Sequence, residues 1–344
     1  MIEETVFSNK TLIKIVKEKY NIVVNDIKKL DRGSANIFSL NNSTYILKEF
    51  QSKYSADEIK KEIAVINHLK KDKQLVPEYI ATQTGKYSFK YKKKIIILQK
   101  FINGYTIDSN NGDYEQIIES ARELGKMINS LERLNYKLPY NDVSSWYKIE
   151  KLNKSIEKNR ELIKNVTGKY KDKIIKDLDD KISMLEYVRD NLNFNEMKNL
   201  TIKNTHGDYS VLQFIYFNSK IKSVIDFVSA CKMPIVWEVI RSYSYIDINA
   251  KDGKIDIENL VNYVKEFMKY VKLNKYDIKY MPYLYLIQLL NSDYGYKQYI
   301  ADNSKQSLLE FAFFRTNLCK HLFENAELIA NELEKYIVAN IDEN

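Results

Sequence analysis

The sequence predicts an α+β protein with a β-rich N-terminal part and a mainly helical C-terminal part. Residues 25–103 contain short runs of β-branched and aromatic residues that alternate with turn residues, as in an antiparallel sheet. From Tyr114 onward, apolar residues recur at helical spacing. Two further strand-like runs, 214–217 and 221–225, interrupt the helical part and are expected to form a hairpin.

The first strands are expected between about residues 25 and 50. The runs 37–40 and 45–48 flank Asn41-Asn42-Ser43, a sequence typical of a tight turn. An earlier turn contains Gly33, Ser34 and Asn36, and small residues there would let backbone amides approach a phosphate. No Gly-x-Gly-x-x-Gly motif is present.

A helix is expected from about Ser55 to Lys71, because Ile59, Ile63, Ile66 and Leu69 repeat at helical spacing. Two acids lie beside this apolar stripe, Glu58 and Glu62. Strands are then expected at 80–82 and 87–91, followed by a buried strand that begins at Ile95 and runs into Gly104.

The C-terminal part is expected to be a succession of helices and to contain no repeat or independent linker. The helices are predicted at 114–131, about 146–165, 173–192, from Trp237, 257–271 and 308–337. The domain boundary is placed at Gly104, which gives an N-terminal domain of 1–103 and a C-terminal domain of 104–344.

Composition excludes several classes of protein. No apolar run approaches the roughly 20 residues that span a bilayer, and the acidic start Met1-Ile2-Glu3-Glu4 differs from a secretory signal, so we expect no membrane contact and a cytoplasmic location. Two cysteines cannot form a disulfide framework. The three scattered histidines argue against a histidine metal site or a Ser-His-Asp triad.

The net charge of +8 raises the alternative of a nucleic-acid-binding protein. Most basic residues alternate with acids, which is typical of a solvated helix face. Only Lys90, Lys92, Lys93 and Lys94 form a dense cluster, which we interpret as a hairpin turn. The charge pattern therefore disfavours nucleic acid as a partner.

The most informative feature is a pair of short motifs, His206-Gly207-Asp208 and Ile225-Asp226-Phe227, separated by the predicted hairpin. This order is expected to aim both carboxylates into one cleft. In phosphate transfer, one aspartate can orient or deprotonate the attacking hydroxyl, and another can hold the magnesium that neutralises the nucleotide phosphates.

At these residues the chain resembles the aminoglycoside phosphotransferase and choline kinase-like superfamily, which are small-molecule kinases. The hallmark of that superfamily is His-Gly-Asp, four residues, Asn, and then Ile-Asp-Phe. Here Gln213 takes the place of the asparagine.

The resemblance implies a bilobal protein-kinase-like fold and ATP and Mg²⁺ as cofactors. It implies these roles: Asp208 as the catalytic residue; Gln213 and Asp226 as metal ligands; Lys48 as the phosphate-contacting lysine, with Glu62 as its ion-pair partner; Gly33, Ser34 and Asn36 in the phosphate loop; and the backbone of Lys100 to Ile102 against the adenine. Glu58 remains a competitor for the role of Glu62, and a solvent-exposed strand end explains Lys48 without any ligand.

The resemblance also concerns two residues around the catalytic loop. His206 is expected to buttress the loop by hydrogen bonds. Glu238 occupies the position of a buried acid that ties a helix start to the loop, although an exposed helix-terminal acid explains it equally well.

The predicted function is an ATP-dependent phosphotransferase, a kinase that transfers the γ-phosphate to a hydroxyl of a small metabolite or antibiotic. The alternative is a catalytically weak pseudokinase that acts as a nucleotide-binding or scaffolding module. It rests on Gln213, whose amide is one methylene further from the backbone, and on Val228, where many relatives carry a second acid.

Overall fold

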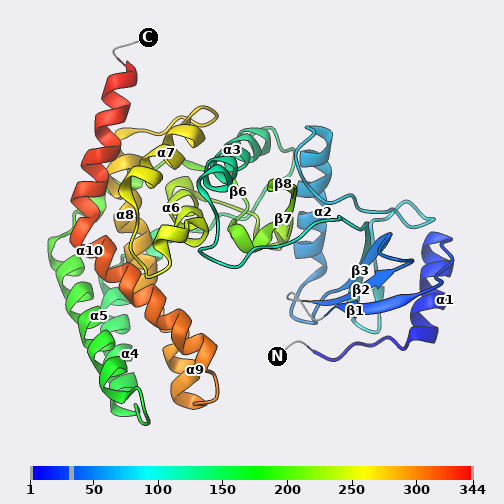
Figure 1. Ribbon diagram of the computed structural model, residues 1–344, viewed down its shortest axis with the longest axis horizontal. Coiled ribbons are helices and arrows are strands. Elements are labelled where there is room, and N and C mark those ends of the chain that lie inside the picture. The colour runs from blue at the N-terminus through cyan, green and yellow to red at the C-terminus, as the bar shows by residue number, and fades with distance from the viewer. Residues whose placement is uncertain (1–2, 31–34, 342–344) are drawn as a thin grey trace. The chain divides into compact units, whose positions relative to one another are not determined.

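The computed structural model describes residues 3–30 and 35–341 and divides into two compact units (Figure 1). Unit 1 comprises Met1–Thr106, Ser130–Leu138 and Gln213–Ala230. Unit 2 comprises Ile107–Asn129, Pro139–Leu212 and Cys231–Asn344. Unit 1 therefore joins the N-terminal sequence to two later segments, of which Gln213–Ala230 is the more distant in sequence.

Unit 1 is built on a five-stranded antiparallel sheet in the order β1-β2-β3-β5-β4. The strands are β1 (Ile27–Leu30), β2 (Asn36–Leu40), β3 (Tyr45–Glu49), β4 (Ser88–Tyr91) and β5 (Lys94–Lys100). Helix α1 (Asn9–Tyr20) packs its apolar face, including Leu12 and Val16, into a core with Phe38, Leu47 and Leu98.

Local sequence explains how these elements begin and end. Asn41, Asn42 and Ser43 all adopt positive φ angles between β2 and β3, as the tight-turn sequence predicts. Helix α2 (Ala56–Lys71) begins at Ser55, whose side chain accepts from the Glu58 amide while the Glu58 carboxylate accepts from the Ser55 amide.

A second sheet of unit 1 is the hairpin of β7 (Phe214–Phe217) and β8 (Lys220–Val224). Asn218 and Ser219 form its turn with φ angles of 49° and 58°, which suits a two-residue hairpin. The backbone of Val224 donates to Leu75 O at 2.7 Å, so the hairpin is fixed to the segment that follows α2.

Unit 2 is mainly helical, with one two-stranded sheet of β6 (Ile202–Thr205) and β9 (Cys231–Pro234). Its helices are α3 (Tyr114–Leu131), α4 (Ile149–Lys164), α5 (Lys171–Asn191), α6 (Ile235–Ile246), α7 (Ile257–Met268), α8 (Lys275–Leu290), α9 (Tyr296–Ala301) and α10 (Gln306–Ile341), although the last residues of α3 belong to unit 1. Both α6 and α8 are buried along most of their length, and α10 packs against α8.

The predicted α+β class, with a β-rich N-terminal part and a mainly helical remainder, is confirmed. The strand predicted at 80–82 is wrong, because no strand spans this segment: Ile80 donates a backbone hydrogen bond to Leu98 O, and the neighbouring Tyr79 forms an isolated bridge with Gln99. The sequence analysis did not predict α1, α8 or α9. Within the described residues, no helix combines the length and the apolar character needed to cross a membrane.

Candidate active site

In unit 1, three predicted site residues meet around one ammonium group. Lys48 Nζ lies 3.3 Å from Asp226 Oδ1 and 3.8 Å from Glu62 Oε1. Lys48 comes from β3, Glu62 from the middle of α2, and Asp226 from the end of the β7–β8 hairpin. The structure therefore brings two neighbouring elements of the N-terminal sequence together with Asp226, which comes much later in the chain.

Burial and charge act in opposite directions on Lys48. Burial alone would lower its pKa, but the carboxylates of Glu62 and Asp226 outweigh that effect, so the pKa of Lys48 is raised and the side chain stays cationic. The Glu62 carboxylate also accepts from the Tyr79 hydroxyl at 2.7 Å. Burial and the Glu62 charge raise the pKa of Tyr79 well above its ordinary value, so this hydroxyl keeps the proton that it donates.

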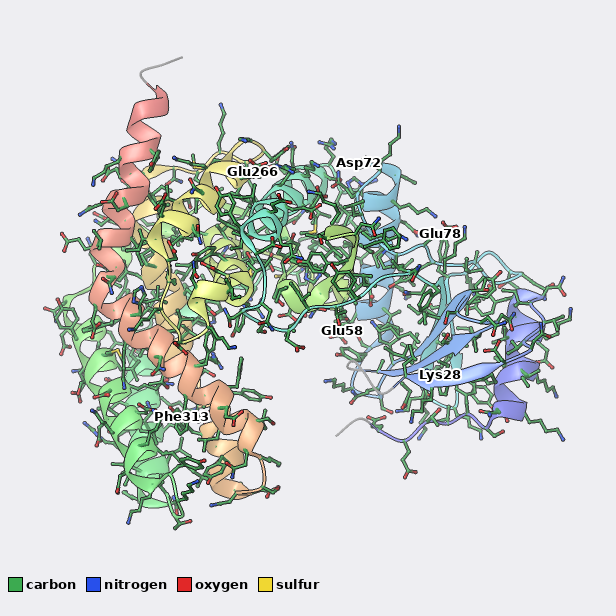
Figure 2. All side chains as sticks on the ribbon, in the orientation of Figure 1. Lys28, Glu58, Asp72, Glu78, Glu266 and Phe313 are labelled. Carbon is green, nitrogen blue, oxygen red and sulfur yellow. The ribbon has the colours of Figure 1, made fainter. Side chains whose placement is uncertain are left out.

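The structure separates the two acids that compete for Lys48. Glu58 is engaged in the capping box at the start of α2, near the end opposite Asp72 (Figure 2). Glu62 comes one turn later, is 1% exposed, and contacts Lys48. Glu58 and Glu62 are four residues apart and share one face of α2, so Glu62 is distinguished by its position one turn further along the helix and by the engagement of Glu58 in the capping box.

Gln213 and Asp226 lie at the base of the same hairpin. The Ile225 amide donates to Gln213 O at 2.9 Å, so the residue beside Asp226 is hydrogen bonded directly to Gln213. Asp226 adopts a left-handed conformation, with φ of 68°, and its side chain is 24% exposed. A carboxylate and an amide oxygen are hard oxygen donors of the type that Mg²⁺ prefers.

Among the described residues, no group of three or more His, Cys, Asp and Glu side chains could hold a metal ion. Gln213 and Asp226 would thus hold a metal with the help of other oxygens. This donor set fits Mg²⁺, which proteins commonly bind through one or two carboxylates together with substrate phosphates.

The other nucleotide residues are placed as follows. Gly33 and Ser34 lie outside the described residues. Asn36 is buried at the start of β2, and its Nδ2 donates to Glu3 O at 2.9 Å. The amides of Lys100 and of the following Phe101 donate to Glu78 O and Thr44 O, each at 2.9 Å.

These hydrogen bonds limit which backbone amides of residues 100–102 are available to an adenine. The Lys100 amide already donates to Glu78 O, and the Lys100 ammonium forms an ion pair with the Glu78 carboxylate at 2.9 Å. In the described part of the chain, the Ile102 amide makes no backbone hydrogen bond. Ile102 is thus the residue of this segment whose amide can donate to a ligand.

In unit 2, Asp208 lies in the loop after β6, and its side chain is 40% exposed. The Asp208 amide donates to His206 Nδ1 at 3.2 Å, and His206 is fully buried. Glu238 of α6 is also fully buried and accepts from the Tyr209 amide at 2.8 Å and from the Thr205 hydroxyl. Glu238 is therefore a buried acid that ties the helix to the loop, and not an exposed acid at a helix end.

Arg241, one turn after Glu238, contacts Asp208 directly. Its guanidinium donates to Asp208 Oδ1 at 2.5 Å and to Tyr209 O at 3.1 Å. The same group lies over the rings of Trp237 and Tyr245, at 5.4 and 5.2 Å from their centroids. Burial opposes its charge, but Asp208 outweighs burial and the pKa of Arg241 is raised.

The sequence analysis did not assign Arg241 or Tyr79 to the site. Arg241 carried a detectable signal, because it follows Glu238 by three residues and so lies on the same helix face. Tyr79 carried none, because its contact with Glu62 depends on how the segment after α2 crosses β5.

Comparison with known proteins links this geometry to a family. The family model described as the phosphotransferase enzyme family (APH) matches residues 26–257. The comparison with curated proteins gave no match. A spectinomycin phosphotransferase solved with ADP and spectinomycin is 12% identical, with a TM-score of 0.64, covering 93% of this chain and 98% of that chain.

Two other solved structures are similar. An amicoumacin kinase in complex with AMP-PNP, Ca²⁺ and its antibiotic is 13% identical, with a TM-score of 0.59, covering 91% of this chain and 94% of that chain. A microcompartment-associated aminopropanol kinase is 12% identical, with a TM-score of 0.61, covering 93% of this chain and 99% of that chain.

At these identities the structural likeness concerns the fold, which confirms the predicted kinase-like class. The match of the family model covers more than half of the chain, including Lys48, Glu62, Asp208, Gln213 and Asp226. The resemblance seen at the two aspartate motifs is thereby confirmed, and the chain belongs to the phosphotransferase enzyme family.

Proposed function

We propose that this chain is an ATP-dependent phosphotransferase that transfers the γ-phosphate to a hydroxyl of a small molecule. The observation that carries the proposal is the position of the Lys48 ammonium between Glu62 and Asp226 in a chain of this family. A lysine that is 14% exposed and held by two carboxylates is suited to meet nucleotide phosphates, because its orientation is fixed before the ligand arrives.

In this proposal, unit 1 binds the nucleotide. Lys48 contacts the phosphates, Glu62 and Tyr79 fix the position of Lys48, and the Ile102 amide donates to the adenine. Gln213 and Asp226 would hold Mg²⁺, which neutralises phosphate charge when bound. Residues 1–103 supply most of these contacts, and the β7–β8 hairpin of residues 104–344 supplies the metal ligands.

Unit 2 supplies the acceptor side of the reaction. Asp208 orients the acceptor hydroxyl and takes its proton as the new P–O bond forms, the bond between the γ-phosphorus and the bridging oxygen breaks, and ADP leaves. Arg241 acts as a positioning residue, because it holds the Asp208 carboxylate and the Tyr209 carbonyl through one guanidinium. Glu238 and His206 hold the loop by accepting hydrogen bonds from the amides of Tyr209 and Asp208.

The acceptor class is a hydroxyl-bearing metabolite or antibiotic. The similar proteins are, by name, kinases of spectinomycin, amicoumacin and aminopropanol, which span both kinds of molecule. A cytoplasmic location, as the composition predicts, would supply the ATP.

A second candidate is a nucleotide-binding module with little transfer activity. The observation that favours it is the metal site, which has Gln213 in place of asparagine and Val228 two residues after Asp226. Such a protein would bind nucleotide through Lys48 but would transfer phosphate slowly.

Two measurements on the full chain separate the candidates. Thermal unfolding with ATP, with and without Mg²⁺, tests binding, since a ligand at about a hundred times its Kd stabilises by about 2.7 kcal/mol. Transfer of label from γ-labelled ATP to a panel of amino alcohols and aminoglycosides tests chemistry. Binding with transfer that Asp208→Asn abolishes supports the enzyme, binding without transfer to any acceptor supports the module, and no binding contradicts both.

A further inference from the structure

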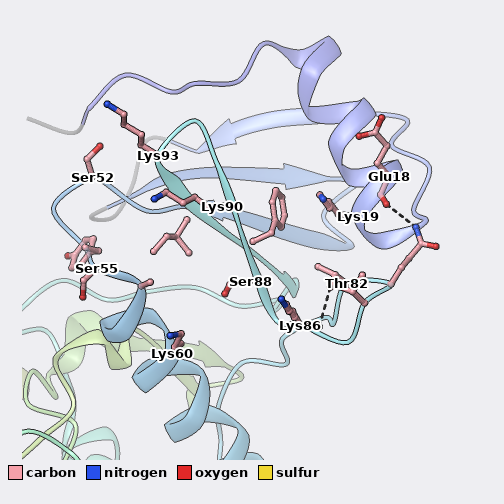
Figure 3. Close-up of a pocket in the computed structure, with 16 residues that line it drawn as sticks. Glu18, Lys19, Ser52, Ser55, Lys60, Thr82, Lys86, Ser88, Lys90 and Lys93 are labelled. Carbon is pink, nitrogen blue, oxygen red and sulfur yellow. Dashed lines mark hydrogen bonds between the residues drawn. The ribbon is translucent and has the colours of Figure 1, made fainter.

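Unit 1 contains a hollow of about 650 Å³ that none of the proposed nucleotide or metal residues lines (Figure 3). Its walls come from the end of α1, the connection between β3 and α2, the first turns of α2, strand β4 and the turn at 82–86. The charged side chains that line it are Glu18, Lys19, Lys60, Lys86, Lys90 and Lys93.

The positive charge of this lysine hollow is largely uncompensated. Glu18 pairs with Lys14 outside the hollow, at 3.8 Å, and Lys60 pairs with Asp57 at 3.1 Å. For the other four lysines, the described residues provide no ion pair within 4.0 Å. Like charges on one concave surface repel each other and raise the local positive potential, so the hollow is suited to attract an anion.

Neutral donors complete the lining. Ser88 and Thr84 present hydroxyl groups, whereas the hydroxyls of Ser52 and Ser55 donate to the carboxylates of Glu3 and Glu58. The Phe89 ring adds an apolar wall beneath Lys19, whose ammonium is 5.7 Å from the ring centroid.

We propose that the lysine hollow is a binding site for a small anion that carries at least two phosphate groups. A single phosphate would contact only part of a surface on which Lys19 and Lys86 line one region and Lys90 and Lys93 another (Figure 3). The volume lies within the roughly 300–1,000 Å³ typical of small-molecule sites. The inference goes beyond the proposed function, because it concerns a ligand other than the reacting nucleotide and acceptor.

Only part of the dense lysine cluster at 90–94 lines the hollow. Lys94 is buried and pairs with Glu3, so it belongs to the fold. Lys92 lies over the Tyr91 ring, at 5.6 Å from its centroid. Lys90 and Lys93 are exposed and line the hollow, which makes them the informative positions for substitution.

The test measures binding of inorganic tripolyphosphate to the full chain by calorimetry. All proteins carry Lys48→Ala, which removes the principal phosphate contact of the proposed nucleotide site. In this background, Lys90→Gln with Lys93→Gln is compared with Lys28→Gln with Lys29→Gln. The control pair removes the same charge from exposed positions of β1 outside the hollow (Figure 2).

The proposal expects saturable binding that the Lys90 and Lys93 changes weaken by about tenfold and the control changes leave within about twofold, since each exposed charge contact contributes modestly. Tripolyphosphate should also bind more tightly than inorganic phosphate. Equal weakening of tripolyphosphate binding by the hollow variant and the control variant, or no saturable binding, would overturn the proposal. Preferential binding of an acidic peptide or a single-stranded oligonucleotide would also overturn it, in favour of a macromolecular partner. Because every protein lacks Lys48, these outcomes do not depend on whether the proposed phosphotransfer occurs.

Discussion

The contact between Arg241 and Asp208 makes a prediction at the scale of single residues. Arg241→Gln should lower kcat by about 10- to 100-fold, the range expected when a hydrogen bond to a charged group is lost. The KM for ATP should change little, because Lys48 and Asp226 are unaltered. The kcat of Arg241→Lys should lie between those of the parent and of Arg241→Gln. Lysine keeps the charge but cannot hold Asp208 and Tyr209 O through one planar group.

The control for this prediction is Arg189→Gln, which removes an arginine that pairs with Asp190 on the surface of α5. Steady-state kinetics of the three variants provide the measurement. A rise in the KM for ATP with unchanged kcat would contradict the positioning role of Arg241.

Gln213 tests whether the metal site is adapted to glutamine. Mg²⁺ requires oxygen ligands at short, well-defined distances. If the backbone bond from Ile225 to Gln213 O already sets the longer side chain in place, Gln213→Asn should withdraw the oxygen and weaken magnesium-dependent ATP binding. We expect this loss, measured as ATP affinity with and without Mg²⁺.

Gln83→Asn, in an exposed turn of unit 1, is the matched control for the loss of one methylene. Tighter magnesium-dependent binding in Gln213→Asn would instead indicate a site that has drifted from function, and would favour the pseudokinase alternative.

At the scale of elements, Gly104 is required by the close approach of β7. A Cβ at this position would lie 2.3 Å from Tyr216 O and 2.6 Å from Ile215 Cγ2. Tyr105 and Tyr216 exchange two backbone hydrogen bonds next to it, of 2.9 and 2.8 Å. Gly104→Ala should therefore destabilise the protein by about 1–3 kcal/mol, as overpacking does.

Urea unfolding measures this loss, and Asn103→Ala is the control because Asn103 is an exposed neighbour. If both variants unfold at the same urea concentration as the parent, the docking of this segment on the hairpin is not needed for stability.

Lys181 of α5 gives a prediction on pH. It is buried and donates to Leu289 O at 3.2 Å and Ser292 O at 2.5 Å. Burial lowers its pKa from 10.5 to about 8. Between these values the unfolded chain binds a proton that the folded chain does not, so this lysine makes stability rise with pH. Relative to Lys181→Met, the parent should gain about 2 kcal/mol from about pH 7.5 to about pH 9.5.

Urea unfolding of the two proteins at several pH values checks the sign and the size of this gain. Lys176→Met, an exposed position on the same helix, should follow the pH dependence of the parent. A gap between parent and Lys181→Met that is constant with pH would show that Lys181 stays charged in the fold.

The elements show where sequence reasoning succeeds. The turns at Asn41-Asn42 and Asn218-Ser219 were predictable, because asparagine tolerates positive φ and the flanking runs alternate as strands do. Helix α8 was not, because it is buried along most of its length and has no polar face to reveal a helical period, and Pro282 interrupts its sequence. Helix α1 was predictable, because four apolar residues recur at helical spacing within its lysine-rich sequence.

The site was predictable to the extent that its residues lie in short motifs. Lys48, Glu62 and Asp226 were predictable from the family resemblance, because Lys48 lies in a recognisable strand, Glu62 in a helix and Asp226 just after a hairpin. Tyr79 depends on a tertiary crossing that periodicity does not reveal, whereas Arg241 was detectable from its spacing of three residues after Glu238. That Asp208 and Asp226 face one cleft stays a prediction, since they belong to different compact units.

At the scale of the whole molecule, unit 1 is assembled from three separate stretches of sequence, and this makes a prediction for ligand binding. Amide hydrogen exchange reports the free energy of local opening, and a ligand that binds only the closed form lowers the exchange rate of the elements it contacts. With ADP and Mg²⁺, protection should therefore increase together in β3, α2, β5 and the β7–β8 hairpin, although more than a hundred residues of sequence separate β5 from the hairpin.

The contrast is with α4 and α5, which pack against each other in unit 2 and should exchange as in the free protein. Lys48→Ala should remove the protection from all the unit 1 elements at once, because that side chain joins β3 to α2 through Glu62 and to the hairpin through Asp226. Protection that appears in β3 and α2 but spares the hairpin would show that Asp226 takes no part in nucleotide binding. Protection confined to unit 2 would move the nucleotide away from Lys48 altogether.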